Sequence, residues 1–189
     1  MDVKEAIETR RAYRSLVPVE ITEDIIKELS RAASLAPTCN NLQPARFVFV
    51  YDPDMLKKMH AALSRNNDWI KAASMIIAVF AKKDMDCVMA DGREYYLYDT
   101  GAAVAFLVLR ATELGLVAHP VAGYDPKMAR EILGIPEDMT VITLVNVGKH
   151  AESIGPLLTE KQAKIEKERP ERLPFDQVFF RNKYQAPKE

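Results

Sequence analysis

The sequence contains few of the residues from which common reaction centres are built. It has two cysteines, Cys39 and Cys87, and three scattered histidines. The cysteines have neither metal-ligand spacing nor the density of a disulfide-rich scaffold, which favours a reducing compartment. We interpret Cys39 as a small buried residue, although its loop could also place the thiol beside a ligand. No two histidines stand at metal-binding spacing, so we expect each to be a surface residue or a hydrogen-bonded polar one.

Several sequence signatures of catalysis are also absent. There is no Walker phosphate loop, no glycine-rich dinucleotide fingerprint after a strand, and no nucleophile elbow. The chain therefore shows no acid, base or nucleophile of its own. If it is an enzyme, we expect a cofactor to carry the chemistry.

The chain has no excess of charge and no long apolar run. Its 26 Lys and Arg residues balance 27 Asp and Glu residues, giving a formal net charge of −1, so neither nucleic acid nor an anionic membrane is an expected partner. No apolar run approaches the roughly 18 to 20 residues that span a bilayer, and the N-terminus is charged from its start. We expect a cytoplasmic protein, and 189 residues suit a single domain with a sizeable core.

Hydrophobic periodicity predicts an alternation of helices and buried strands. Helices are expected at 2–10, 22–36, 53–63, 69–73, 95–114, 127–133 and 159–169, and strands at 47–51, 75–80 and 141–147. Residues 116–124 are expected to form a short extended segment that opens into a loop with proline and glycine. The strand at 47–51 is apolar throughout, as in an interior strand covered on both faces. The helix at 95–114 should be buried on more than one side, and its small residues suit either a dimer seam or close packing within one subunit. Residues 82–92 have no period and are interpreted as a surface loop or lid.

Two segments carry more polar or charged side chains than packing requires. The loop Ala36–Arg46 carries two prolines, two adjacent asparagines and a glutamine, and could be a binding surface or a turn capped by its own side chains. Arg10, Arg11 and Arg14 gather where the first helix ends. They could complement the helix dipole, or they could clamp a phosphate, because arginine matches phosphate oxygens in a bidentate way.

Four motifs resemble the FMN-dependent nitroreductase family in order and spacing. They are Arg10–Leu16 (RRAYRSL), Ala36–Pro44 (APTCNNLQP), the segment from Gly115-Leu116 through the loop Val121–Tyr124, and the turn Leu133–Asp138. The resemblance covers nearly the whole chain. The resemblance implies an α+β, three-layer α-β-α fold with a central mixed sheet, in an intertwined homodimer with shared active sites. It also implies that residues 170–189 form a C-terminal arm packing on the partner subunit.

The resemblance also implies particular site residues. The arginine-rich start would hold the FMN phosphate and ribityl chain together with a C-terminal arginine, for which Arg181 is a second candidate. The loop after the second helix would reach the flavin of the partner subunit, and the loop near residue 122 would pass along the isoalloxazine ring. The implied cofactor-binding residues are Arg10, Arg11, Ala12, Arg14, Pro37, Thr38, Asn41, Val121, Ala122, Gly123 and Arg172. No catalytic side chain and no metal ligand is implied.

By this resemblance, bound FMN would accept hydride from NADH or NADPH and pass two electrons to a nitroaromatic, quinone or similar acceptor in a ping-pong cycle. Two positions depart from the family pattern. Ala12 replaces a frequent serine, and Ala45-Arg46 follows Gln43-Pro44 where an aromatic residue is common. Two alternatives stay open: a related flavoprotein with another reaction, such as dehalogenation or flavin cleavage, or a flavin-binding protein without turnover.

Overall fold

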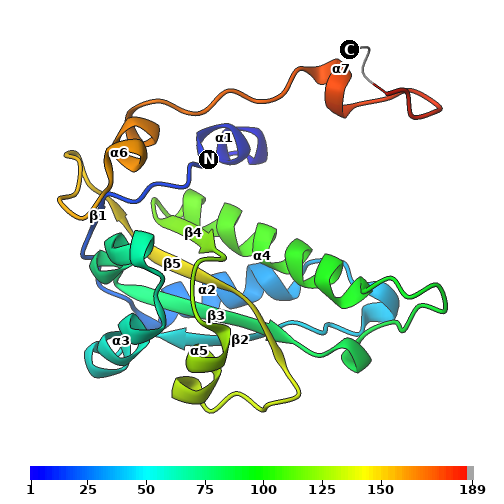
Figure 1. Ribbon diagram of the computed structural model, residues 1–189, viewed down its shortest axis with the longest axis horizontal. Helices are drawn as coiled ribbons and strands as arrows, with labels where there is room; N and C mark the ends of the chain where they lie inside the picture. Colours follow the sequence, from blue (N-terminus) through cyan, green and yellow to red (C-terminus); the bar gives the residue numbers. More distant parts are fainter. Residues whose placement is uncertain (187–189) are drawn as a thin grey trace.

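A sheet lies between two layers of helices in the computed structural model, which describes residues 1–186 (Figure 1). The strands follow the order β1-β5-β3-β2, and β4 also pairs with β5. Their bounds are β1 Leu16–Val17, β2 Arg46–Val50, β3 Met75–Ala81, β4 Val117–Val121 and β5 Thr140–His150. The α+β, three-layer class expected from the sequence is confirmed.

The sheet differs from the expected mixed sheet in its strand directions. Within residues 1–186, every pairing is antiparallel: β1 with β5, β2 with β3, β3 with β5, and β4 with β5. An apolar run shows that a strand is buried but does not reveal which way its neighbour runs. Strand direction depends on how the helical connections cross the sheet.

Five of the seven α-helices within residues 1–186 begin at a side chain that caps them. The α-helices are α1 Val3–Thr9, α2 Glu23–Ser34, α3 Pro53–Met59, α4 Tyr95–Glu113, α5 Pro126–Leu133, α6 Glu160–Lys167 and α7 Phe175–Val178. Short 3₁₀ helices are η1 Cys39–Asn41, η2 His60–Ala62, η3 Arg65–Ala72 and η4 Lys83–Met85. N-cap side chains come from Asp2, Thr22, Asp52, Asp125 and Thr159. Each accepts a backbone N–H that the first turn leaves without an intrahelical partner.

The centre of the core is β3, which is buried at each of its seven positions. Because side chains alternate across a strand, Ile77 and Val79 pack toward α2 and α4, whereas Ile76 and Ala78 pack toward α3, η3 and α5. The sheet thus separates two apolar clusters, each covered by helices. This arrangement positions the loops at both ends of the strands.

Two burial predictions were wrong. Strand β2 lies at the edge of the sheet, and only its last residue, Val50, is fully buried. Helix α4 is buried along one face, through positions such as Ala103 and Leu107, while Gly101 and Phe106 on the other face are exposed. Composition alone overstates burial, because apolar residues in a single chain can also face a second subunit. No helix within the described residues is long and apolar enough to cross a membrane.

Candidate active site

An arginine-rich pocket of about 270 Å³ lies between the segment after α1 and the segment after α6. Its lining residues are Arg10, Arg11, Ala12, Tyr13, Arg14, Ile165, Arg169, Pro170 and Arg172. The structure thus brings together the N-terminal arginine cluster and Arg172, although about 160 residues of sequence separate them. None of these lining residues is acidic. We call this cavity the arginine pocket.

Two of the five arginines hold the pocket together. Arg11 Nη2 donates to the backbone oxygens of Ile165 (2.8 Å) and Glu166 (3.2 Å). Arg169 Nη2 donates to the backbone oxygens of Glu8 and Arg10, each at 2.7 Å. These bonds tie the C-terminal segment to the N-terminal one, so both guanidiniums have structural roles.

The other three, Arg10, Arg14 and Arg172, keep their guanidiniums available. No side-chain hydrogen bond or carboxylate ion pair involves them among residues 1–186. Burial lowers the pKa of Arg10, and repulsion from Arg169 and Arg172 lowers it further. A cluster of cations that repel one another is stabilised by an anion, and the guanidinium geometry suits a phosphate.

Glu166 organises this segment, and the sequence did not reveal it. Its buried carboxylate accepts the backbone N–H of Arg14 (3.0 Å and 3.1 Å) and that of Ser15 (2.8 Å). His150 Nε2 lies 3.5 Å from the same group. Glu166 belongs to a helix with mostly charged residues, so nothing in the sequence distinguishes it from its solvent-exposed neighbours.

Below the arginine pocket, an aromatic pair connects it to β4. The single tryptophan, Trp69, is fully buried and stacks on His119, with ring centroids 4.7 Å apart. The guanidinium carbon of Arg14 lies 5.9 Å from the centre of the Trp69 ring. His119 Nδ1 donates to the backbone oxygen of Tyr13 at 3.0 Å, as expected of a hydrogen-bonded polar residue. Through its contacts with Arg14 and Tyr13, this pair links the lining of the pocket to β4.

We expect His119 to make the protein sensitive to acid. Burial lowers its pKa to about 4; the Tyr13 carbonyl and Glu166 oppose this shift, and Arg14 and Arg10 add to it. The unfolded chain, with a histidine pKa of about 6.5, gains the proton first as pH falls, so stability decreases from pH 6.5 toward pH 4. Urea denaturation should show a loss of about 2 kcal/mol at pH 5 relative to pH 7.5 that His119→Asn removes. An equal loss in the variant would contradict this assignment.

Val121 is the last residue of β4, and Ala122 and Gly123 follow it in the connection to α5. Asn67 Nδ2 donates to the Gly123 oxygen at 2.7 Å, and the Ser64 N–H donates to it at 3.2 Å. A Cβ on Gly123 would lie 2.5 Å from Asn67 Nδ2, so a larger residue here would displace the Asn67 amide. Asn67 was not singled out in the sequence, since one asparagine in a short polar stretch carries no distinctive pattern.

The loop Ala36–Arg46 lies elsewhere. Thr38 lines a second, smaller cavity between α2, α4 and β2, and that cavity shares no residue with the arginine pocket. The loop attaches near the start of α4, where the Asp99 carboxylate accepts the Cys39 N–H at 2.7 Å. Helix α1 instead packs near the end of α4, beside Leu109 and Glu113. At 1.5 Å per residue, these two places on α4 are about 15 Å apart.

Pro37, Thr38 and Asn41 are therefore not brought to the arginine pocket of the same chain. Within the loop, the Thr38 hydroxyl accepts the Gln43 N–H at 3.1 Å, and Asn40, Asn41 and Gln43 all have positive φ. Asparagine tolerates this backbone region better than most residues. Part of the loop's amide content thus serves its own conformation.

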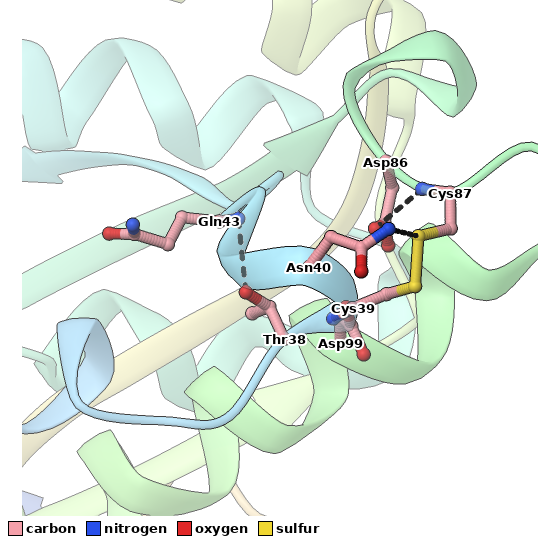
Figure 2. The surroundings of a disulfide bond; sticks show 7 residues. All are labelled: Thr38, Cys39, Asn40, Gln43, Asp86, Cys87 and Asp99. Carbon is pink, nitrogen blue, oxygen red and sulfur yellow. Dashed lines mark hydrogen bonds between the residues drawn. A yellow bond between two sulfur atoms is a disulfide. The ribbon is translucent and has the colours of Figure 1, made fainter.

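The two cysteines form a disulfide, contrary to the sequence-based interpretation (Figure 2). Cys39 comes from the loop Ala36–Arg46 and Cys87 from the segment after η4, and neither is fully buried. Their separation of 48 residues in sequence concealed the pairing, because only the packing of both segments against α4 brings them together. The cysteine-based argument for a reducing compartment therefore no longer holds.

Comparison with known proteins identifies the fold and the family. The model of the nitroreductase family matches residues 7–68 and 61–149. A protein of Archaeoglobus fulgidus, provisionally named NADH dehydrogenase/NAD(P)H nitroreductase, is 34% identical over 146 residues, which cover 75% of this chain and 82% of that protein. The NADH dehydrogenase of Thermus thermophilus is 26% identical over 188 residues, covering 80% of this chain and 88% of that one.

Solved structures with the same fold include proteins that contain FMN. An oxidoreductase described as containing FMN has a TM-score of 0.84 at 24% identity, covering 99% of this chain and 95% of its own. A nitroreductase-like protein from Exiguobacterium sibiricum, solved in complex with FMN, has a TM-score of 0.80 at 20% identity, with coverage of 96% and 98%. At these identities the structural likeness shows the fold, whereas the match to the family model covers most of the chain. The chain therefore belongs to the nitroreductase family of oxidoreductase enzymes.

Proposed function

We propose that the protein is a homodimeric, FMN-dependent oxidoreductase that takes electrons from NADH or NADPH and passes them to a nitroaromatic, quinone or similar acceptor. The observation that carries the proposal is the arginine pocket, where Arg10, Arg14 and Arg172 converge without a carboxylate partner within the described residues. The names of the relatives and the FMN-bound neighbour support the same chemistry.

The residues of the arginine pocket fit the phosphate end of FMN. A phosphate monoester carries close to two negative charges and three acceptor oxygens, which match three free guanidiniums. Ala12 lacks the hydroxyl that a serine would offer, but its backbone lines the same cavity. The mutual repulsion that lowers the pKa of Arg10 would be relieved by this anion.

When bound, FMN supplies the two-electron chemistry, accepting hydride from the nicotinamide and delivering electrons to the acceptor in a ping-pong cycle. The chain supplies position and charge. Arg10, Arg14 and Arg172 would hold the phosphate, and the loop Val121–Gly123, braced by Asn67, would lie along the isoalloxazine ring. No side chain of this protein is proposed as an acid, base or nucleophile.

A second subunit is part of the proposal because the loop bearing Thr38 and Asn41 cannot reach the arginine pocket of its own chain. The exposed face of α4 offers the small residues Gly101 and Ala105, which permit close approach of another helix. The segment from residue 170 runs away from the body past α1 to α7 (Figure 1), and Phe175 is 79% exposed. Such an apolar segment needs cover, so we propose that it is an arm packing on the partner. The part of this arm at 187–189 lies outside the described residues.

The test is anaerobic reduction of the purified protein. We expect a yellow protein whose flavin absorbance bleaches rapidly when NADH or NADPH is added and returns when an acceptor is added. A flavin that stays oxidised with both nicotinamides would instead favour a flavin-binding protein without turnover. A colourless protein that FMN cannot reconstitute would remove the proposal.

A further inference from the structure

The disulfide joins two irregular segments that lie 48 residues apart in the sequence. Cys39 belongs to the loop Ala36–Arg46, and Cys87 belongs to the irregular segment Lys82–Glu94, which runs from the end of β3 to the start of α4 (Figure 2). We call the second segment the β3–α4 segment. Both cysteine residues are partly exposed, so the disulfide lies near the surface, as attack by a small thiol in solution requires.

Apart from the disulfide, the middle of the β3–α4 segment has few attachments. At its base, Lys82 forms ion pairs with Asp138 (2.8 Å) and Asp84 (2.9 Å). From residue 87 to residue 93, the hydrogen bonds found within residues 1–186 stay inside the segment, with one exception: Asn40 Nδ2 donates to Cys87 Sγ at 3.4 Å. This hydrogen bond and the disulfide therefore both connect residues 87–93 to the loop Ala36–Arg46.

The two sulfur atoms are held close by the backbone as well as by their bond. The Asp99 carboxylate accepts the Cys39 N–H, and the Asp86 carboxylate accepts the Cys87 N–H, each at 2.7 Å. Both aspartates are almost fully buried, with exposed fractions of 1% and 4%. Because Asp86 and Asp99 anchor the peptide groups of the cysteines, two separated thiols would stay near each other and could pair again.

We propose that Cys39 and Cys87 form a thiol–disulfide exchange site, with a dithiol as its reductant, and that this exchange determines whether residues 87–93 are held against the loop Ala36–Arg46. The proposal extends the proposed function, because that loop carries Thr38 and Asn41. Reduction would free residues 88–93, whose hydrogen bonds within residues 1–186 stay inside the segment, while Cys87 stays beside the buried Asp86. The site needs neither flavin nor nicotinamide to operate.

The exchange proceeds in two displacements. A thiolate of the dithiol attacks Cys39 Sγ, the protein S–S bond breaks, and Cys87 leaves as a thiolate. This thiolate accepts a hydrogen bond from Asn40 Nδ2 and then takes one proton from water. The second thiol of the reductant attacks the mixed disulfide and releases Cys39. The protein gains two electrons and two protons, and the dithiol becomes a disulfide.

The test compares protein purified without reductant with protein treated with dithiothreitol. Alkylation followed by mass spectrometry should find no free thiol before treatment and two after it. Trypsin should then cut at Arg93 about 10-fold faster in the reduced protein, because local release exposes the backbone. In the double variant Cys39→Ser/Cys87→Ser, this cleavage should be fast with or without dithiothreitol. Free thiols before reduction, or equal cleavage of the two wild-type states, would overturn the proposal.

A separate experiment tests whether the incoming thiolate attacks Cys39 and not Cys87. Glutathione, a monothiol, should leave its mixed disulfide on Cys39, with Cys87 free. Asn40→Asp keeps the shape and tolerates the positive φ of 48°, but it replaces the donor by a negative charge, so reduction should slow several-fold. Glutathione found on Cys87, or an unchanged rate in Asn40→Asp, would overturn the assigned direction. Because none of these measurements uses flavin chemistry, their failure is distinguishable from failure of the proposed reductase activity.

Discussion

Replacing Arg10 with alanine should weaken FMN binding by about 10- to 100-fold, because a charge-assisted hydrogen bond to phosphate contributes about 1.5 to 3 kcal/mol. The apo protein should be at least as stable as the wild type. Arg10 has no side-chain hydrogen bond within residues 1–186, and its neighbours Arg169 and Arg172 lower its pKa by repulsion. The single tryptophan, Trp69, lies beneath the pocket, so quenching of its fluorescence on FMN addition measures the affinity.

Arg11→Ala is the matched control, because Arg11 lines the same pocket but its guanidinium bonds to backbone oxygens of Ile165 and Glu166. Removing it leaves these acceptors without their donor, which costs about 1 to 3 kcal/mol of apo stability. A chain of this size should lose about 2 to 4 °C in melting temperature for each kcal/mol. If Arg10→Ala lowered apo stability as much as Arg11→Ala and left FMN affinity unchanged, the phosphate assignment would be wrong.

Two inactive variants should restore activity to each other if the active site spans two subunits. Arg10→Ala/Arg14→Ala damages the arginine pocket, and Thr38→Glu places a negative charge in the loop proposed to reach the partner's flavin. Each homodimer should lose most of its activity. When both chains are co-expressed, random pairing leaves about a quarter of all sites without either lesion, so about a quarter of wild-type activity should return.

The control for this experiment is co-expression of two differently tagged copies of Arg10→Ala/Arg14→Ala, which should restore nothing. A site built within one chain would also give no recovery in the mixed pair. That outcome would remove the shared site from the proposal while leaving the FMN-dependent chemistry to be tested by anaerobic reduction. Recovery would show that the loop Ala36–Arg46 works with the arginine pocket of the other subunit.

The sequence by itself determined the local elements and the family. Caps such as Thr22 and Asp125, the Gly134 stop and the apolar run of β3 depend on neighbours within a few residues, so their helices and strands were predictable. Four ordered motifs carried the resemblance to the nitroreductase family, which the comparisons confirmed. The arginine cluster was recognisable because three guanidiniums exceed what one helix end requires.

Only the tertiary structure decided which of those arginines remain free. Arg11 and Arg14 look equivalent in the sequence, but Arg11 bonds to backbone oxygens of α6, whereas the Arg14 guanidinium lies over Trp69. The roles of Glu166 and Asn67 likewise depend on contacts with residues more than 50 positions away. Strand direction and the edge position of β2 depend on how the chain crosses the sheet, which no local pattern records.

The cysteines show most clearly what the sequence could not determine without the tertiary structure. Their number and spacing argued against a disulfide, because spacing in sequence reports only local geometry. Folding of both segments against α4 brings Cys39 and Cys87 together, with the buried Asp99 and Asp86 receiving their N–H groups. The sequence determined which residues could bind, stack or form a bond. The packing of distant segments decided which of them do, because these contacts depend on distances that form only when the sheet and its two helical layers assemble.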